Sequence, residues 1–257
     1  MHEEELIAIL KSHAGVNEDL SYWTEAQQIR ALMNISMPDG LDEHYYHLQD
    51  EFLQGQKAKK TIVEAESLSF ERNISIWRGD ITCLKSDAIV NACNEKMLGC
   101  FVPLHGCVDN AIHSAAGLQV RRDLEKMMEE QGHDEPNGQV KVTKGYNLPS
   151  SYIFHTVGPI VQGRVSRQNE EDLRSCYLSC LKKADEMGLK TIAFCSLSTG
   201  IYGYPIEAAS SLAIETVERY LTETKPSLRV VFCVYSEKDE DVYRRNWELW
   251  KKKADVN

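Results

Sequence analysis

The chain of 257 residues has neither a long apolar segment nor a basic N-terminus. No run approaches the roughly 18–20 consecutive apolar residues that a membrane-spanning helix needs. The first residues, MHEEELIAIL, are acidic where a secretory signal would be basic, so export is not expected. These absences predict a cytoplasmic protein that does not bind a membrane.

Positive charge is scarce as well. The 29 Lys and Arg residues are outnumbered by 39 Asp and Glu residues, and the formal net charge is −10. This balance argues against broad binding of nucleic-acid backbones, but it leaves room for one small anion held by backbone N–H groups at a helix end. No carboxylate cluster suited to a pair of Mg²⁺ ions is visible, which disfavours a generic phosphatase or nuclease.

The eight cysteines lack the dense pattern of a secreted disulfide scaffold. Most lie in apolar runs such as IAFCS and VVFCV, where a free thiol packs as a small core residue. The exception is the stretch LGCFVPLHGC, in which Cys100, His105 and Cys107 offer two thiolates and an imidazole. By itself this pattern fits either a metal site or a loop of buried thiols. Three protein ligands with a vacant fourth position are typical of catalytic zinc, whereas a structural site would need a fourth ligand, for which His113 is the nearest candidate.

The periodicity of apolar residues divides the chain into two parts. Residues 1–66 show helical spacing, with Ser21 as a candidate N-cap, and predict a helical extension packed on the main domain. From residue 67 to 257, strand-like runs (ISIW, DAIVNA, QVKVTKG, SYIFHTVG, TIAFCS and RVVFCVYS) are separated by helical stretches. This alternation predicts an α/β layered fold with a mostly parallel sheet, in which ligands bind at the carboxyl ends of the strands.

Two loops lie at such strand ends. One follows AIVNA and contains the Cys/His stretch; the other, SLSTGIYGYP, follows TIAFC and leads into a helix at Pro205. Small residues beside a helix N-terminus either cradle a phosphate or simply connect a strand to a helix. Taken alone, GDIT at 79–82 and the pair Asn91 and Asn94 are ordinary turn or strand-end features.

Taken together and in this order, GDITCLKSDAIVNACNEKML, VDNAIHSAAG, IFHTVGP and IAFCSLSTGIYGYP resemble the macrodomain family from about Ser67 to the C-terminus. The resemblance implies a three-layer α/β/α fold with a mixed sheet and a cleft for ADP-ribose. It is closest to macrodomains that act as ADP-ribosyl hydrolases.

The family pattern implies a role for each matching position. Asp80, with the backbone of Ile81, would bind adenine, and Tyr235 would stack on it. Asn94 would hold the distal ribose, supported by Asn91. The remaining ligand-binding positions would form two phosphate loops, the first around Gly106, Val108 and Asp109 and the second from Ser198, Thr199, Gly200, Ile201 and Tyr202.

One departure points to a subclass. Hydrolytic macrodomains carry an almost pure glycine run before VDG, but here CFVPLH interrupts it and Asn110 replaces the next glycine. This version, with its helical extension, resembles the zinc-containing macrodomains of pathogenic bacteria and some fungi. The resemblance implies one Zn²⁺ per chain on Cys100, His105 and Cys107. It also implies gene linkage to a sirtuin-like ADP-ribosyltransferase and a lipoylated carrier protein.

The sequence therefore predicts a zinc-dependent hydrolase that removes mono-ADP-ribose from Asp or Glu side chains of a protein. Asn94 and the metal are expected to be indispensable. Asp109 is either catalytic or an N-cap of the following helix, and His155 is expected to be a packed strand residue. The alternatives are a reader that binds ADP-ribose without turnover, an O-acetyl-ADP-ribose deacetylase, and a zinc that only shapes the loop.

Overall fold

A six-stranded sheet forms the centre of the molecule. The computed structural model describes residues 2–224 and 226–254. The strands are β2 (Ile74–Arg78), β4 (Ala88–Cys93), β5 (Lys141–Lys144), β6 (Tyr152–Val157), β7 (Thr191–Phe194) and β8 (Arg229–Val234). Their order is β2-β8-β7-β4-β6-β5, and all neighbours are parallel except β5, which runs antiparallel to β6. The predicted mixed, mostly parallel sheet is confirmed.

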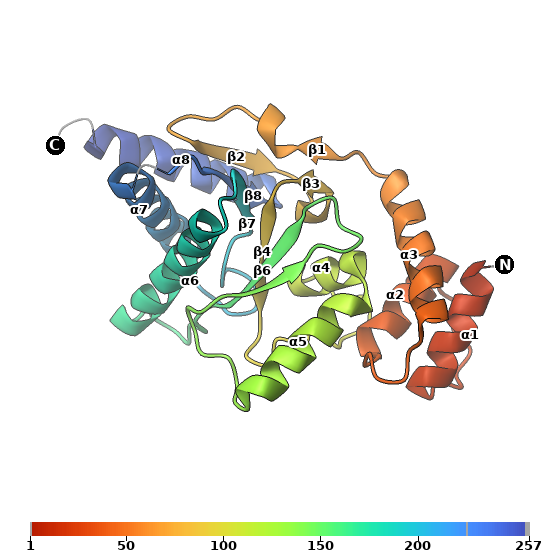
Figure 1. The fold of residues 1–257 in the computed structure, drawn as a ribbon. Helices are drawn as coiled ribbons and strands as arrows, with labels where there is room; N and C mark the ends of the chain where they lie inside the picture. The colour runs from red at the N-terminus through yellow and green to blue at the C-terminus, as the bar shows by residue number, and fades with distance from the viewer. Residues whose placement is uncertain (1, 225, 255–257) are drawn as a thin grey trace.

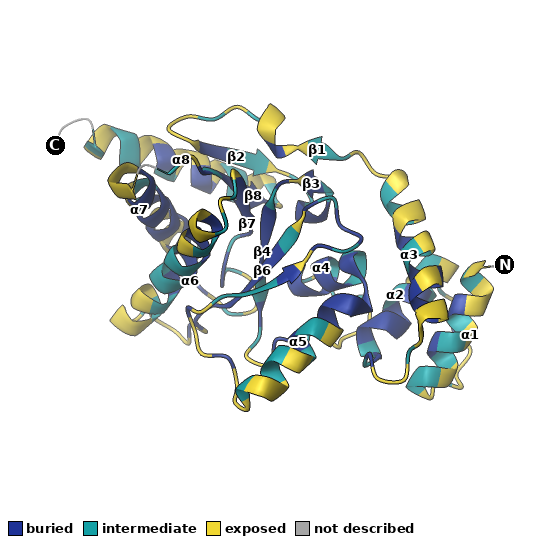
Figure 2. Ribbon diagram, in the orientation of Figure 1, coloured by how far each residue is buried: buried dark blue, intermediate teal, exposed yellow. Residues whose placement is uncertain are grey.

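The central strands are apolar on both faces because helices cover both sides of the sheet. All four residues of β7 are buried, and β8 is buried at every position but its first. Figure 2 shows this band of buried residues running through the middle of the molecule. Continuous apolar runs such as TIAF thus mark the interior of the sheet.

Helices form a layer on each side of the sheet (Figure 1). The helices of the main domain are α4 (Val108–Ala116), α5 (Leu118–Gln131), α6 (Arg167–Glu186), α7 (Ile206–Thr224) and α8 (Glu237–Ala254). The right-handed connection from β4 to β6 places α4 and α5 on one face. The connections from β6 to β7 and β8, which run the other way along the sheet, place α6 and α7 on the opposite face, where α8 packs on α7. The predicted three-layer arrangement is confirmed.

The stretch after Asp109 forms two helices rather than one. Gly117 ends α4 and precedes α5 with φ of 101°, a conformation that favours glycine. A Cβ atom there would also lie 2.6 Å from Nε2 of Gln49, a residue of the N-terminal helices. The break therefore combines backbone geometry with close packing against the extension.

The first 60 residues form three helices: α1 (His2–Ala14), α2 (Glu25–Ile35) and α3 (Glu43–Ala58). Thr24 caps α2 in a reciprocal capping box with Gln27, so the predicted cap at Ser21 is wrong. These helices share a small apolar core that includes Leu118 at the start of α5. The extension thus packs beside α4 and α5, as Figure 1 also shows. The proposed boundary at residue 66 stays a prediction.

Short elements flank β2 in the chain. β1 (Val63–Glu64) and a 3₁₀ turn at Ala65–Ser67 precede it, and a 3₁₀ turn at Ile81–Cys83 and β3 (Leu84–Lys85) follow it. β1 and β3 form a separate parallel pair, which the sequence patterns did not predict. None of the helices in the described ranges is long and apolar enough to cross a membrane.

Candidate functional site

The carboxyl ends of β2, β4, β6, β7 and β8 surround one pocket of about 670 Å³. Because these strands are parallel, the loops that follow them meet at one edge of the sheet. Most of the predicted site residues line this pocket, namely Asp80, Ile81, Asn94, Cys100, Gly106, Cys107, Val108, Asp109, Ser198, Thr199, Gly200, Ile201, Tyr202 and Tyr235. Asn91 and His105 do not line it.

The Cys/His loop follows β4 and ends at the start of α4. Its three candidate ligands, Cys100, His105 and Cys107, are half-buried, and their donor atoms all lie within 4.8 Å of one another. The Cys100 Sγ and His105 Nδ1 atoms are 3.6 Å apart. A tetrahedral zinc with Zn–S of about 2.3 Å and Zn–N of about 2.0–2.1 Å sets such atoms roughly 3.5–3.6 Å apart. The donor set and its spacing fit a zinc ion.

His113 does not belong to this cluster. Among the described residues only the three loop ligands form a group of metal-binding type. The His113 ring is buried one turn into α4, and its Nε2 lies 3.5 Å from Oδ1 of Asp109. The centroids of the His113 and His155 rings are 5.9 Å apart. Burial, with the neighbouring His155 ring, holds the pKa of His113 well below 6.5. A structural site with His113 as fourth ligand is therefore not formed here.

Asp109 lies inside α4 and is not its N-cap. The cap is Cys107, whose Sγ accepts a hydrogen bond from the backbone N–H of Asn110 at 3.4 Å. The Asp109 carboxylate instead turns toward the sheet and accepts a hydrogen bond from Asn91 Nδ2 at 2.8 Å. Burial raises the pKa of Asp109 to about 6, although the bond from Asn91 opposes this shift. The cap interpretation from the sequence is wrong, while a catalytic role stays a prediction.

Asn91 has a different place from the one predicted. Its side chain is fully buried beneath the pocket floor and joins Asp109 to His155, whose Nδ1 is 3.3 Å from Asn91 Nδ2. His155 is also fully buried, and its Nε2 lies 2.9 Å from Thr143 Oγ1 on the neighbouring strand β5. Burial lowers the pKa of His155 to about 3, so the ring is neutral. His155 is a packed strand residue, as the sequence indicates, and Asn91 supports Asp109 from below.

Asn94 stands where β4 gives way to the loop. Its Oδ1 accepts a hydrogen bond from the Lys96 backbone N–H at 3.0 Å, and its Nδ2 donates to the Gly99 carbonyl at 3.3 Å. These bonds fix the amide at the pocket wall, close in the chain to the first candidate metal ligand, Cys100.

Two sets of backbone N–H groups line the same pocket. In the described part of the chain, the N–H groups of residues 106–109, at the start of α4, donate no hydrogen bond, and neither do those of residues 200–202. Ser198 holds the second loop with a left-handed φ of 62°, and its carbonyl accepts from Tyr204 at 2.9 Å. Facing amide groups of this kind, with a helix N-terminus behind one set, can hold the charge of a diphosphate.

The pocket lining also contains Asp80 and Tyr235, which follow β2 and β8 in the chain. Asp80 caps the turn after β2, and its Oδ1 accepts hydrogen bonds from Thr82 N at 2.9 Å and Thr82 Oγ1 at 2.7 Å. Burial raises the pKa of Asp80, but these bonds and the Lys60 ammonium outweigh it and leave the pKa below 3.8. The Tyr235 ring is 83% exposed at the rim. A carboxylate beside an exposed ring suits a flat nitrogen heterocycle such as adenine.

Among the pocket residues that sequence reasoning did not select is Arg30, which comes from α2 in the extension. Its guanidinium donates to Asn110 Oδ1 from Nη2 at 2.7 Å and from Nε at 3.2 Å, and to the His105 carbonyl at 3.1 Å. The one signal in the sequence was Asn110, which departs from the family pattern. Helical periodicity could not identify Arg30, because it does not reveal which distant loop a helix contacts.

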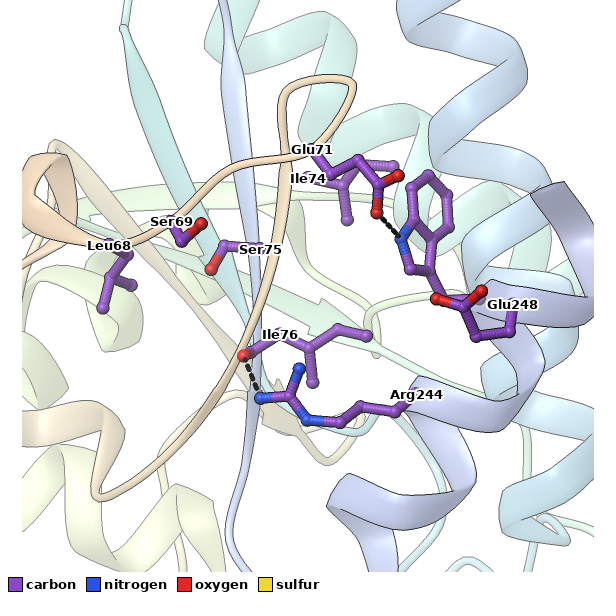
Figure 3. Close-up of a pocket in the computed structure, with 9 residues that line it drawn as sticks. Leu68, Ser69, Glu71, Ile74, Ser75, Ile76, Arg244 and Glu248 are labelled. Carbon is purple, nitrogen blue, oxygen red and sulfur yellow. Dashed lines mark hydrogen bonds between the residues drawn. The ribbon is translucent and has the colours of Figure 1, made fainter.

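A second pocket of about 300 Å³ lies between β2 and α8 and is distinct from the predicted site (Figure 3). Two of its polar side chains already have partners: Arg244 donates to the Ile76 carbonyl, and the Trp247 indole donates to Glu71. Most of the predicted site residues line the larger pocket and none of them lines this one, so the larger pocket is the candidate active site.

The comparisons with known proteins agree with this geometry. The family model described as Macro domain matches residues 90–213. The chain is 44% identical over 218 residues to a protein-ADP-ribose hydrolase of Staphylococcus aureus, covering 84% of this chain and 82% of the relative. It is 41% identical over 222 residues to a protein-ADP-ribose hydrolase of Treponema medium, covering 84% and 85%. The predicted enzyme class, a hydrolase, is confirmed.

Solved structures show the same fold. A Trypanosoma brucei macrodomain in complex with ADP-ribose matches with a TM-score of 0.66 and 30% identity, covering 84% of this chain and 94% of that one. An Oceanobacillus iheyensis macrodomain with ADP matches with a TM-score of 0.64 and 38% identity, covering 69% and 91%.

Proposed function

Since the chain belongs to the macrodomain family, we propose that it is a zinc-dependent protein-ADP-ribose hydrolase that removes mono-ADP-ribose from Asp or Glu side chains. The observation that carries the proposal is the placement of the Cys100, His105 and Cys107 donor atoms, which lie within 4.8 Å of one another in a loop bordering the pocket. A module that only binds ADP-ribose has no need of three such ligands beside Asn94.

The pocket offers a place for each part of the substrate. The free N–H groups of residues 106–109 and 200–202 would take the diphosphate, and Asp80 would accept a hydrogen bond from the adenine amino group. Tyr202, held by its bond to the Cys93 carbonyl at 3.5 Å, would close over the distal ribose. In this arrangement the anomeric carbon would lie near Asn94 and the Cys/His loop.

The chemistry requires an oriented sugar, a placed water molecule, and stabilisation of the charge that develops on the ring and on the leaving carboxylate. Asn94 would orient the ribose, where small misplacements are costly. Asp109 lies in the same wall, fixed by Asn91, and would orient the water. A zinc ion on Cys100, His105 and Cys107 would supply a Lewis acid and lower the pKa of a bound water.

The cellular context is part of the proposal. By resemblance, the modified protein is a lipoylated carrier that a sirtuin-like transferase ADP-ribosylates, and the reaction takes place in the cytoplasm.

The test compares the wild type with Cys100→Ala, His105→Ala and Cys107→Ala on proteins ADP-ribosylated at Asp or Glu. Cys180→Ala, a buried α6 cysteine that does not line the pocket, is the matched control. Released ADP-ribose, bound ADP-ribose and metal content are measured for each.

The proposal expects the three ligand variants to lose metal and turnover while the control keeps both. Full turnover in a metal-free triple variant would exclude the zinc mechanism. Loss of ADP-ribose binding together with turnover would indicate a zinc that only shapes the loop.

The linkage is tested by offering the wild type the Asp/Glu-linked protein, a serine-linked protein and O-acetyl-ADP-ribose. Preferential turnover of the first supports the proposal. Exclusive turnover of O-acetyl-ADP-ribose would make the enzyme a deacetylase, and binding without turnover of any ester would make it a reader.

A further inference from the structure

The loop that carries the candidate zinc ligands has few hydrogen bonds of its own to fix its conformation. Between Gly99 and Cys107 the backbone turns through left-handed conformations at Gly99 (φ 85°) and at Leu104 (φ 56°). Leu104 adopts this conformation although it is not glycine, which calls for support from the surroundings. Within the loop itself the one backbone hydrogen bond among the described residues is from His105 N to the Val102 carbonyl.

That support comes from α2 in the N-terminal extension. Asn34 Oδ1 accepts a hydrogen bond from the Leu104 backbone N–H at 3.0 Å, at the strained residue. One turn earlier on the helix, Arg30 Nη2 donates to the carbonyl of the ligand His105 at 3.1 Å. Residues four apart on a helix lie on the same face, so α2 contacts two consecutive loop residues with one surface.

Asn110 carries the contact further along the loop. Its fully buried amide accepts both hydrogen bonds from Arg30 at Oδ1. Its Nδ2 donates to the Val102 carbonyl at 3.0 Å and to the carbonyl of the ligand Cys100 at 3.5 Å. The asparagine that replaces the usual glycine is therefore a bridge between the helix and the loop.

We propose that Arg30 and Asn34 are positioning residues, through which the N-terminal extension holds residues 99–107 in the conformation that ligates zinc. The inference rests on the proposed zinc site. Arg30 contacts both Asn110 and His105 through the fork of its guanidinium, which a lysine ammonium cannot reproduce. In the described part of the chain, the hydrogen bonds of the Arg30 guanidinium go to an amide oxygen and a backbone carbonyl. Partners that orient metal ligands typically change metal affinity by about 10–100-fold when removed.

The experiment uses the full chain with Arg30→Ala, Arg30→Lys and Asn34→Ala. The matched control is Gln54→Ala, which removes another hydrogen bond between the extension and the main domain, from Gln54 Nε2 to Asn147 Oδ1 at 2.8 Å, in α3 rather than beside the loop. Zinc affinity is measured by competition with a chromophoric chelator. Amide hydrogen exchange of residues 99–107 is measured in the metal-free proteins, and thermal unfolding identifies any variant that has lost its fold.

We expect Arg30→Ala and Asn34→Ala to weaken zinc binding by about 10–100-fold and to speed exchange in the loop, most of all at Leu104 in Asn34→Ala. Arg30→Lys keeps the charge and most of the stem, so it should remain folded and still lose zinc affinity. Gln54→Ala should match the wild type in both readouts. The inference is overturned if the Arg30 and Asn34 variants match Gln54→Ala.

The two readouts separate this inference from the proposed function. A wild type that binds no zinc contradicts the zinc site. In that case, amide hydrogen exchange of the metal-free proteins still shows whether α2 fixes the conformation of the loop. A wild type that binds zinc tightly, with unchanged affinity and exchange in the variants, contradicts the positioning role alone.

Discussion

Gly158, directly after β6, lies against the second amide loop of the pocket. A Cβ atom at this position would be 2.1 Å from Ser198 Oγ, whereas ordinary contacts begin at 3.4 Å. The next nearest atom, Ser198 Cβ, would be at 3.5 Å, which is an acceptable distance. Gly158→Ala therefore creates one contact that is too short, with the Ser198 hydroxyl, and either this hydroxyl rotates or the loop shifts to relieve it.

The size of the effect follows from packing. Overfilling a well-packed site typically costs about 1–3 kcal/mol. Because Ser198 belongs to the loop whose amides face the pocket, we expect Gly158→Ala to lower both the free energy of unfolding and the affinity for ADP-ribose, with a combined cost in this range.

The structure also predicts a rescue. The Ser198 hydroxyl is buried without a hydrogen-bond partner among the described residues, and the φ of 62° suits glycine. Ser198→Gly alone should therefore change stability little, and the double variant Gly158→Ala/Ser198→Gly should regain most of the lost stability and affinity. All four proteins are compared by urea unfolding and by calorimetric titration with ADP-ribose. Additive effects, within about 0.5 kcal/mol, would refute the predicted contact.

Three further predictions concern single side chains. Asp80→Ala should weaken ADP-ribose binding by about 1–3 kcal/mol, because it removes a charged acceptor; unchanged affinity in a titration would place adenine elsewhere. Asn94→Ala should reduce kcat far more than it weakens ADP-ribose binding, and wild-type turnover would show that Asn94 does not anchor the ribose. Arg121→Met should lower the free energy of unfolding in urea by about 1–3 kcal/mol, since the buried guanidinium donates to the carbonyls of Leu98 and Met33; a variant as stable as the wild type would contradict this.

The sequence was a good guide to the sheet because parallel strands covered on both faces must be apolar along their whole length. Apart from Asn91 and Arg229, AIVNAC and RVVFCV have this texture, and they form β4 and β8. The same alternation placed both informative loops at one edge of the sheet. Their convergence on a single pocket follows from parallel pairing, not from any one residue.

The errors arose where contacts between distant parts of the chain decide the place of a side chain. Asp109 suits an N-cap by composition, but Cys107 occupies that position and Asp109 turns to meet Asn91. Asn91 was expected to support Asn94 at the ribose, but its side chain is buried and bonds to Asp109 and His155 instead. The role of Arg30 depends on how the extension docks on α4, and apolar periodicity predicts which face is buried without naming its partner.

The central claim is that the Cys100, His105 and Cys107 loop holds a zinc ion on which hydrolysis depends. The most direct measurement determines the metal content of the purified wild type and its turnover of Asp/Glu-linked ADP-ribosyl protein, before chelation, after chelation and after Zn²⁺ is returned. The account predicts one zinc per chain, activity lost with the metal, and activity restored by Zn²⁺. Full turnover by the stripped protein, or stoichiometric zinc without turnover of any ester, would contradict it.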